Sequence, residues 1–127
     1  MGDLTTKGKT TIGNLLIDTA NWSGLTYVAL GTNGTMAKAT DTKLGNEVVR
    51  RLISIRALLD NKMLLSETFP KADCTYYIKE VGIFGDEPEN AATGDPDTGA
   101  LAYRQVMDKN NSDGLKDIVA DVEIEIS

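Results

Sequence analysis

The sequence contains no histidine, one cysteine and few aromatic residues, which make up 6% of its 127 positions. The absence of histidine removes the commonest general base and the commonest zinc ligand, so catalysis would have to use carboxylates, lysine, tyrosine or Cys74. Cys74 has no imidazole to activate it and no second cysteine to pair with, so we interpret it as a partly buried structural thiol. The sequence therefore predicts a protein that is not an enzyme and that holds no cofactor and no zinc, with stability arising from packing and association.

Long apolar segments and excess positive charge are missing as well. No stretch approaches the roughly 20 apolar residues that span a bilayer, and the first residues lack the apolar run of a signal peptide, so we expect cytoplasmic synthesis and no membrane partner. The net charge of -6 argues against a nucleic-acid partner, which would need clustered lysine and arginine. A hydrophobic content of 41% is typical of globular proteins, and the length predicts a single domain over residues 1–127.

Short apolar segments separated by turn residues are what the sequence does contain. In residues 118–126 apolar residues alternate with mainly acidic ones, which predicts a strand with one buried and one wet face. Residues 51–59 and 62–69 predict a hairpin around Asp60-Asn61. One face of its first strand is expected to carry Ile53, Ile55, Ala57 and Leu59. Further strands are predicted over residues 25–32, 76–84 and 100–107. Together these segments predict a mainly β fold, either an antiparallel β-sandwich or a partly closed barrel.

Three other segments complete the expected organisation. Residues 5–20 place apolar positions three and four apart and predict one short helix near the amino terminus, although their glycines and threonines disfavour it. Residues 35–49 predict a loop with a helical turn begun by Thr40 or Asp41. Residues 86–99 hold two prolines, two glycines and five acidic residues, which predict an exposed loop.

Two glycine-containing strings suggest phosphate or anion binding, and each has a simpler structural interpretation. Residues 7–10 (KGKT) are similar to the end of a phosphate-binding loop, but the first glycine of that motif falls one residue too early, at Gly2, so we reject this site. Residues 31–34 (GTNG) offer backbone N–H groups that can cradle an anion. Asn-Gly is, however, the pair that tight turns favour, so a turn is the preferred interpretation.

Two acidic clusters suggest chemistry of other kinds. Residues 95–99 and the acids before them suggest calcium binding, but an EF-type loop would need a glutamate where Val106 stands, so we favour a solvated loop and leave calcium open. Asp121, Glu123 and Glu125 suggest the paired carboxylates of glycoside hydrolysis. Carboxylates on a wet strand face more often serve solubility and edge protection, which is our preferred interpretation.

Four segments, in the same order, resemble phage tail-fibre and tail-collar-like proteins. Residues 27–32 (YVALGT) and 41–50 (DTKLGNEVVR) are similar to the family pattern ALGTGTT followed by DTALGNEVYR. Residues 80–85 (EVGIFG) resemble the family's EVGLF strand, and residues 99–104 (GALAYR) its GTLLAR strand. The resemblance runs from about residue 5 to the carboxyl terminus. It implies a small β-rich virion module without catalytic residues, which assembles around a symmetric axis or on a larger scaffold.

The function implied by this resemblance is that of a bacteriophage virion structural protein, a tail-fibre or baseplate appendage or adaptor that assembles through protein–protein contacts. Two alternatives stay open: a capsid decoration protein, and a carbohydrate-binding module for host recognition. The expected location is the virion. The expected partners are further copies of the chain, with a trimer favoured, other virion proteins and, for the carbohydrate-binding alternative, a host surface glycan.

A candidate assembly interface follows from residue type, because aromatic residues and arginine dominate interaction hot spots. Several of the aromatic candidates are equally consistent with core positions. For Glu47 with Arg50 and Arg51, a structural ion pair or a subunit contact is preferred over substrate binding. The candidate residues are Trp22, Tyr27, Glu47, Arg50, Arg51, Tyr76, Tyr77, Tyr103 and Arg104.

Overall fold

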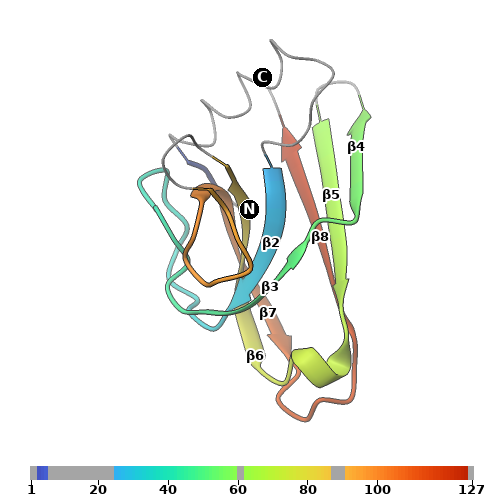
Figure 1. Cartoon of the computed structure of the whole chain (residues 1–127). Coiled ribbons are helices and arrows are strands. Elements are labelled where there is room, and N and C mark those ends of the chain that lie inside the picture. Colours follow the sequence, from blue (N-terminus) through green and yellow to red (C-terminus); the bar gives the residue numbers. More distant parts are fainter. Residues whose placement is uncertain (1–2, 6–24, 60–61, 87–90, 126–127) are drawn as a thin grey trace.

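The computed structural model describes residues 3–5, 25–59, 62–86 and 91–125. These residues form two antiparallel sheets, which lie face to face in Figure 1. Sheet A has five strands in the order β1-β7-β6-β2-β3, and sheet B has three in the order β4-β5-β8. The strands are β1 (Asp3–Leu4), β2 (Leu25–Gly31), β3 (Glu47–Leu52), β4 (Ile55–Leu59), β5 (Lys62–Phe69), β6 (Tyr77–Gly85), β7 (Ala100–Asn110) and β8 (Ile118–Glu125). A short 3-10 helix, η1 (Lys71–Asp73), follows β5.

The main core lies between the two sheets. Strand β8 alternates strictly between buried and exposed residues, as its sequence predicts, because only its inner face packs against sheet A. The inner faces of both sheets meet in one apolar cluster. Its largest fully buried members include Leu30, Leu65, Phe69, Ile83 and Ile124. The two sheets therefore share a single core, which confirms the prediction of a mainly β protein with antiparallel sheets.

Sheet A is buried on its outer face as well. Two loops cover that face: the first loop (residues 32–46) joins β2 to β3, and the second loop (described over residues 91–99) precedes β7. A second apolar cluster lies beneath them, formed by Ala29, Leu44, Phe84 and Leu101. Burial on both faces explains why residues 28–31 of β2 and 81–85 of β6 are continuously apolar and do not alternate.

One side of the sandwich is joined by the chain itself. After β3 the chain leaves sheet A at Ile53, whose N–H donates to the carbonyl of Thr26 (2.9 Å), and enters sheet B at Ser54, whose N–H donates to the carbonyl of Ser66 (3.3 Å). On the opposite side, β8 is an edge strand of sheet B among the described strands. The two sheets therefore do not form a closed barrel.

Several sequence-based predictions differ from this structure. The helix predicted over residues 5–20 lies outside the described residues except for Thr5, and the described part of the chain contains no α-helix. The helical turn predicted between residues 35 and 49 is wrong: residues 38–41 form a turn, closed by the N–H of Asp41 on the carbonyl of Lys38 (3.0 Å), and β3 follows. The hairpin of β4 and β5 is confirmed, but Ile55 faces outward and is 59% exposed.

Candidate functional site

The outer face of sheet A places charged side chains directly beneath the two loops. Strand pairing sets Glu80 of β6 beside Gly31 of β2, and Arg104 of β7 beside Gly82 of β6. A Cβ atom at Gly31 would lie only 2.3 Å from a carboxylate oxygen of Glu80. The glycine therefore provides the space in which a full-length glutamate side chain can lie flat against the sheet.

Glu80 is the centre of the first polar cluster, which we call the Glu80 clamp (Glu80, Arg104 and the first loop). Its Oε1 accepts hydrogen bonds from the N–H of Gly45 (2.8 Å) and from Nε of Arg104 (3.0 Å). Its Oε2 accepts hydrogen bonds from the N–H groups of Asn33 (3.1 Å) and Asn46 (2.8 Å). A carboxylate has about four acceptor positions. Glu80 is therefore saturated, and it ties the beginning of the first loop to its end.

Arg104 completes this clamp by reaching the middle of the same loop. Its Nη1 donates to the carbonyl of Thr35 (2.8 Å) and lies 3.3 Å from a carboxylate oxygen of Asp41, and its Nη2 donates to the carbonyl of Asn33 (3.1 Å). The side chains of Glu80 and Arg104 are 0% and 3% exposed. Burying two charges so completely is tolerated only when both are paired and hydrogen-bonded, as they are here.

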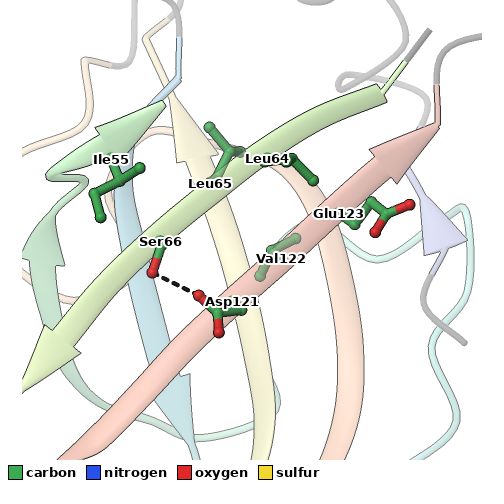
Figure 2. Close-up of a pocket in the computed structure, with 7 residues that line it drawn as sticks. All are labelled: Ile55, Leu64, Leu65, Ser66, Asp121, Val122 and Glu123. Carbon is green, nitrogen blue, oxygen red and sulfur yellow. Dashed lines mark hydrogen bonds between the residues drawn. The ribbon is translucent and has the colours of Figure 1, made fainter. Parts of the chain in front are cut away.

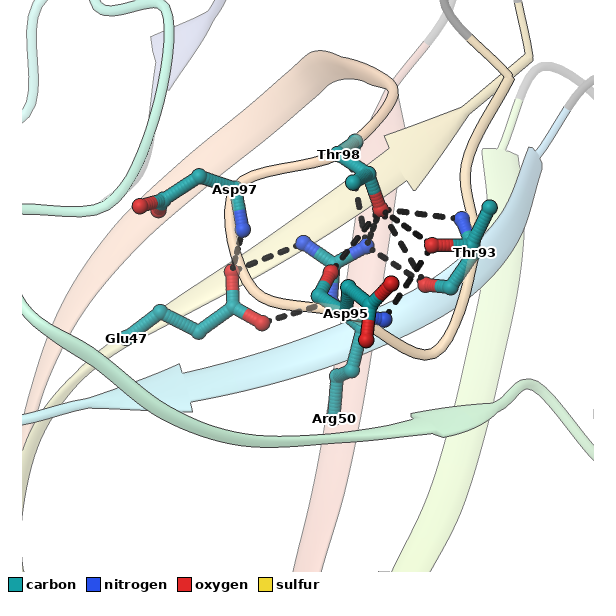
Figure 3. Close-up of polar contacts among 6 residues, drawn as sticks. All are labelled: Glu47, Arg50, Thr93, Asp95, Asp97 and Thr98. Atoms are coloured by element: carbon teal, nitrogen blue, oxygen red, sulfur yellow. Dashed lines mark hydrogen bonds and ion pairs between the residues drawn. The ribbon is translucent and has the colours of Figure 1, made fainter.

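The second polar cluster is the Arg50 clamp (Arg50, Glu47 and residues 93–98 of the second loop), shown in Figure 3. Nε and Nη2 of Arg50 bind the two carboxylate oxygens of Glu47 (2.5 and 2.7 Å), a bidentate pairing. Nη1 donates to the carbonyls of Thr93 and Thr98, both at 3.0 Å. Glu47 in turn accepts a hydrogen bond from the N–H of Asp97 (3.1 Å). The pair therefore fastens the second loop to the edge of sheet A.

Aromatic rings determine how the guanidinium group of Arg50 lies. Its central carbon is 4.4 Å from the centre of the Phe84 ring and 5.5 Å from that of Tyr27. The planar group thus lies against aromatic faces while its edge donates to the loop, a combination that lysine cannot reproduce. Asp97 and Gly99 have positive φ angles of 63° and 81°, which let the loop turn back over the arginine.

The chemistry of this face is consequently structural. The four charged side chains of the two clamps bind backbone groups and one another within the same chain. Residues 31–34 do cradle an anion through a backbone N–H group, as one interpretation of the sequence suggested, but the anion is the chain's own Glu80 carboxylate. Asn33 forms an Asx turn, in which its side chain accepts a hydrogen bond from the N–H of Thr35 (2.8 Å), in place of the tight backbone turn that the Asn-Gly pair predicted.

The calcium hypothesis concerns the second loop. Within the described ranges 3–5, 25–59, 62–86 and 91–125, no three His, Cys, Asp or Glu side chains lie close enough to hold a metal ion. Asp86 accepts a hydrogen bond from the N–H of Ala92 (2.8 Å). The described residues of the loop are mostly exposed, as expected, and Glu87 and Glu89 lie outside them, so calcium binding stays an open hypothesis.

The predicted interface residues are distributed over the whole molecule. Glu47, Arg50, Tyr103 and Arg104 are buried within the chain, and Tyr27 is half-buried beside Arg50. Arg51, Tyr76 and Tyr77 are partly exposed, each by about 40% of its surface. Trp22 lies outside the described residues. The structural ion pair, one of the two preferred interpretations of Glu47 and Arg50, is what the geometry shows; an assembly role for the nine residues stays a prediction.

Glu80 is the functional residue of this face that sequence reasoning missed. A glutamate inside a strand normally indicates a solvent-exposed position. Its neighbours along the same face, Gly82 and Phe84, do not indicate whether that face is buried or exposed. The one available signal was Gly31, whose missing side chain makes room for the carboxylate, but its pairing with Glu80 becomes visible only with the strand register.

A second surface lies on the outer face of sheet B, which we call the sheet B face (Ile55, Ala57, Leu64, Ser66, Asp121 and Glu123). Figure 2 shows most of these side chains around a shallow groove of about 390 Å³. Exposed Ile55 and half-buried Leu64 provide its apolar part. Asp121 accepts a hydrogen bond from Ser66 (2.6 Å), and Glu123 pairs with Lys62 (3.0 Å). This surface therefore combines apolar side chains on β4 and β5 with carboxylates on β8.

Comparisons of the chain with protein families, with curated proteins and with solved structures gave no match. Among the described residues, no helix has the length and apolar character needed to cross a membrane. The function is therefore inferred from the geometry of the chain's own residues together with the four-segment resemblance.

Proposed function

We propose that the chain is a structural subunit of a tailed-bacteriophage virion, in a tail fibre or baseplate as an appendage or adaptor, and that it acts through protein–protein contacts. The observation that carries this proposal is the meeting of the four resembling segments in one place. These four segments supply the charged side chains of the two clamps and the ring of Tyr27 beside Arg50; the charged residues are Glu47, Arg50, Glu80 and Arg104. Segments that are separate in the sequence thus contribute to the two clamps, which hold the first and second loops in fixed positions.

The contacts themselves are assigned to the sheet B face. Protein–protein interfaces combine apolar and polar side chains, as this face does. Ile55 is 59% exposed and lines the same groove as half-buried Leu64 of the neighbouring strand, so the apolar side chains here adjoin one another. Covering it with another subunit would stabilise the assembly by the burial of this apolar surface.

The oligomeric state is part of the proposal. A chain of this size buries a modest core, and association around a three-fold axis would cover more of its apolar surface. We expect multi-angle light scattering of the purified protein to give the mass of three chains. A monomer at every concentration would leave contacts with other virion proteins as the only assembly route.

The decisive experiment is immunogold labelling of phage particles from the source of this sequence, using antibodies raised against the purified chain. Label at the tail or baseplate supports the proposal. Label over the capsid shell would replace it with the decoration alternative, and particles without label would overturn both.

A matched pair of variants tests the assigned surface. Ile55→Lys places a charge in the apolar part of the sheet B face, whereas Leu115→Lys makes the same kind of change at an exposed leucine in the loop before β8. We expect Ile55→Lys to reduce incorporation into particles at least tenfold and Leu115→Lys to leave it unchanged. Equal incorporation of both variants would show that the sheet B face is not the contact surface.

A further inference from the structure

The free edge of β8 borders a second groove, of about 230 Å³. Three consecutive β8 residues, 119 to 121, line it although their side chains alternate between the two faces, so the strand's backbone edge itself forms one wall. The other wall is the inner face of sheet A, where buried Val81 lies at the base of the groove and Gln105 and Met107 are partly exposed. Lys109 follows them along β7.

An edge strand in this position can accept one further strand. Every second residue of β8 directs its backbone N–H and C=O groups away from β5, and among the described strands none pairs with them. A strand added here would continue sheet B over the inner residues of β7. Its inward side chains would enter the groove beside Ala120 and cover partly exposed Met107, which favours aliphatic residues at those positions.

The charges on the outer face of β8 determine which residue types suit the outward positions of the added strand. The outer face of β8 carries Asp121, Glu123 and Glu125 at successive outward positions, so the residues opposite them would lie within about 5.5 Å, Cβ to Cβ. Glu123 is already paired with Lys62, whereas Asp121 accepts a hydrogen bond from the neutral hydroxyl group of Ser66. A lysine or arginine opposite Asp121 would therefore gain an ion pair.

The same acidic row disfavours a second copy of β8 as the added strand. In the antiparallel registers that overlap most of the two strands, with Asp121 opposite Asp121, Glu123 or Glu125 of the other copy, acidic residues would lie opposite acidic residues. Repulsion between like charges thus disfavours self-pairing in these registers and favours a strand of opposite charge as the occupant.

We propose that the edge of β8 is a docking site for an extended segment of another protein, in which aliphatic residues alternate with lysine or arginine, bound by strand addition to sheet B. This inference goes beyond the proposed function and holds whether or not the chain belongs to a phage particle. Its test, peptide binding in solution, is independent of particle labelling, so either proposal can fail without the other.

The probe is an acetylated, amidated eight-residue peptide of alternating valine and lysine, compared with a peptide of alternating valine and glutamate. We expect the valine–lysine peptide to bind at least tenfold more tightly at low salt, and to slow amide hydrogen exchange in residues 118–125 more than in β4. Equal binding of both peptides, no binding at millimolar concentration, or protection confined to another strand would overturn the proposal.

Variants assign the effect to the acidic row. Asp121→Lys is expected to lower affinity for the valine–lysine peptide at least tenfold, and Asp121→Asn, which preserves the size of the side chain, by a smaller factor. Asp95→Lys makes the same charge change in the second loop over sheet A and is expected to leave affinity within twofold. If Asp121→Asn and Asp95→Lys behave alike, charge selection by β8 is refuted.

Discussion

Glu80 receives four hydrogen bonds in the interior of the chain, and its replacement tests how strongly the first loop depends on it. Glu80→Gln keeps the size of the side chain but removes its charge, and the new amide group places N–H donors beside backbone N–H groups. Arg104 would then be a buried cation with less compensation. Breaking a buried ion pair in this way typically costs about 3–5 kcal/mol, so we expect a loss of that order in the free energy of unfolding, measured by chemical denaturation.

The matched control is Glu123→Gln, which removes an equal charge from an exposed pair with Lys62. Exposed ion pairs contribute little to stability. We expect this variant to unfold at nearly the same denaturant concentration as the unmodified protein. Comparable losses for the two variants would show that burial of the Glu80 clamp is not what makes it stabilising.

Cys74, which lies between η1 and β6, provides a test of how tightly the interior is packed. Its side chain is fully buried, and burial, assisted by the neighbouring Asp73 carboxylate, raises the pKa of its thiol. The thiolate is the reactive form, so we expect Ellman's reagent at pH 8 to modify native Cys74 at least about 100-fold more slowly than the unfolded chain. Ser112→Cys, at an exposed turn, should add one rapidly reacting thiol as a control. Rapid modification of both thiols would mean that the site of Cys74 opens readily.

At the scale of elements, sequence patterns predicted strands well where only one face is buried. In β8 the inward residues are apolar and the outward ones mainly acidic, so periodicity alone gave both the strand and its buried face. Strand β3 was missed for the opposite reason. Its Glu47 and Arg50 are charged and still buried, because each neutralises the other, and a pattern based on polarity interprets such residues as solvent-exposed.

The orientation of β4 shows a second limit of sequence patterns. Ile53, Ile55 and Ala57 were expected to share one buried face of a single strand. The chain crosses between the two sheets at residues 53–54, so Ile53 is buried while Ile55 faces outward. Which face of an apolar strand becomes the core depends on such a crossing, and that is a tertiary feature that local sequence does not encode.

The first loop offers a test in which one kind of substitution is made at two positions. A Cβ atom at Gly31 would lie 2.3 Å from Oε2 of Glu80 and 2.6 Å from the carbonyl oxygen of Asn46, whereas at Gly34 the nearest atom is 3.6 Å away. Gly31→Ala should therefore displace the clamp and destabilise the protein by about 1–3 kcal/mol, the usual range for overpacking. Gly34→Ala should stay within about 0.5 kcal/mol of the unmodified protein. Thermal unfolding of the two variants measures the difference, and equal melting temperatures would contradict the close approach of Gly31 to Glu80.

At the scale of the whole molecule, the two sheets are joined by a polar contact as well as by their shared core. Glu67 of β5, on the inner face of sheet B, accepts hydrogen bonds from Nε of Arg51 in β3 (2.7 Å) and from the hydroxyl of Ser54 (2.5 Å). These contacts lie on the side where the chain crosses between sheets, whereas the opposite side ends at β8, an edge strand among the described strands. Polar contacts and the chain crossing therefore join the two sheets on the same side.

This arrangement predicts how stability depends on pH. Burial alone would raise the pKa of Glu67, but the hydrogen bonds from Ser54 and Arg51 outweigh it and lower the pKa below its usual value of 4.5. A carboxylate whose pKa is lower in the folded state stabilises the fold above its unfolded pKa, and this contribution disappears as pH falls through the folded pKa.

We expect Glu67→Gln to reduce the free energy of unfolding by roughly 1–2 kcal/mol at pH 7, since the partner Arg51 is partly exposed. Denaturation at several pH values should show that the unfolding free energies of the variant and the unmodified protein converge below about pH 4.5, because protonated Glu67 resembles glutamine. A gap that stays constant down to pH 3 would mean that the charge of Glu67 does not hold the sheets together.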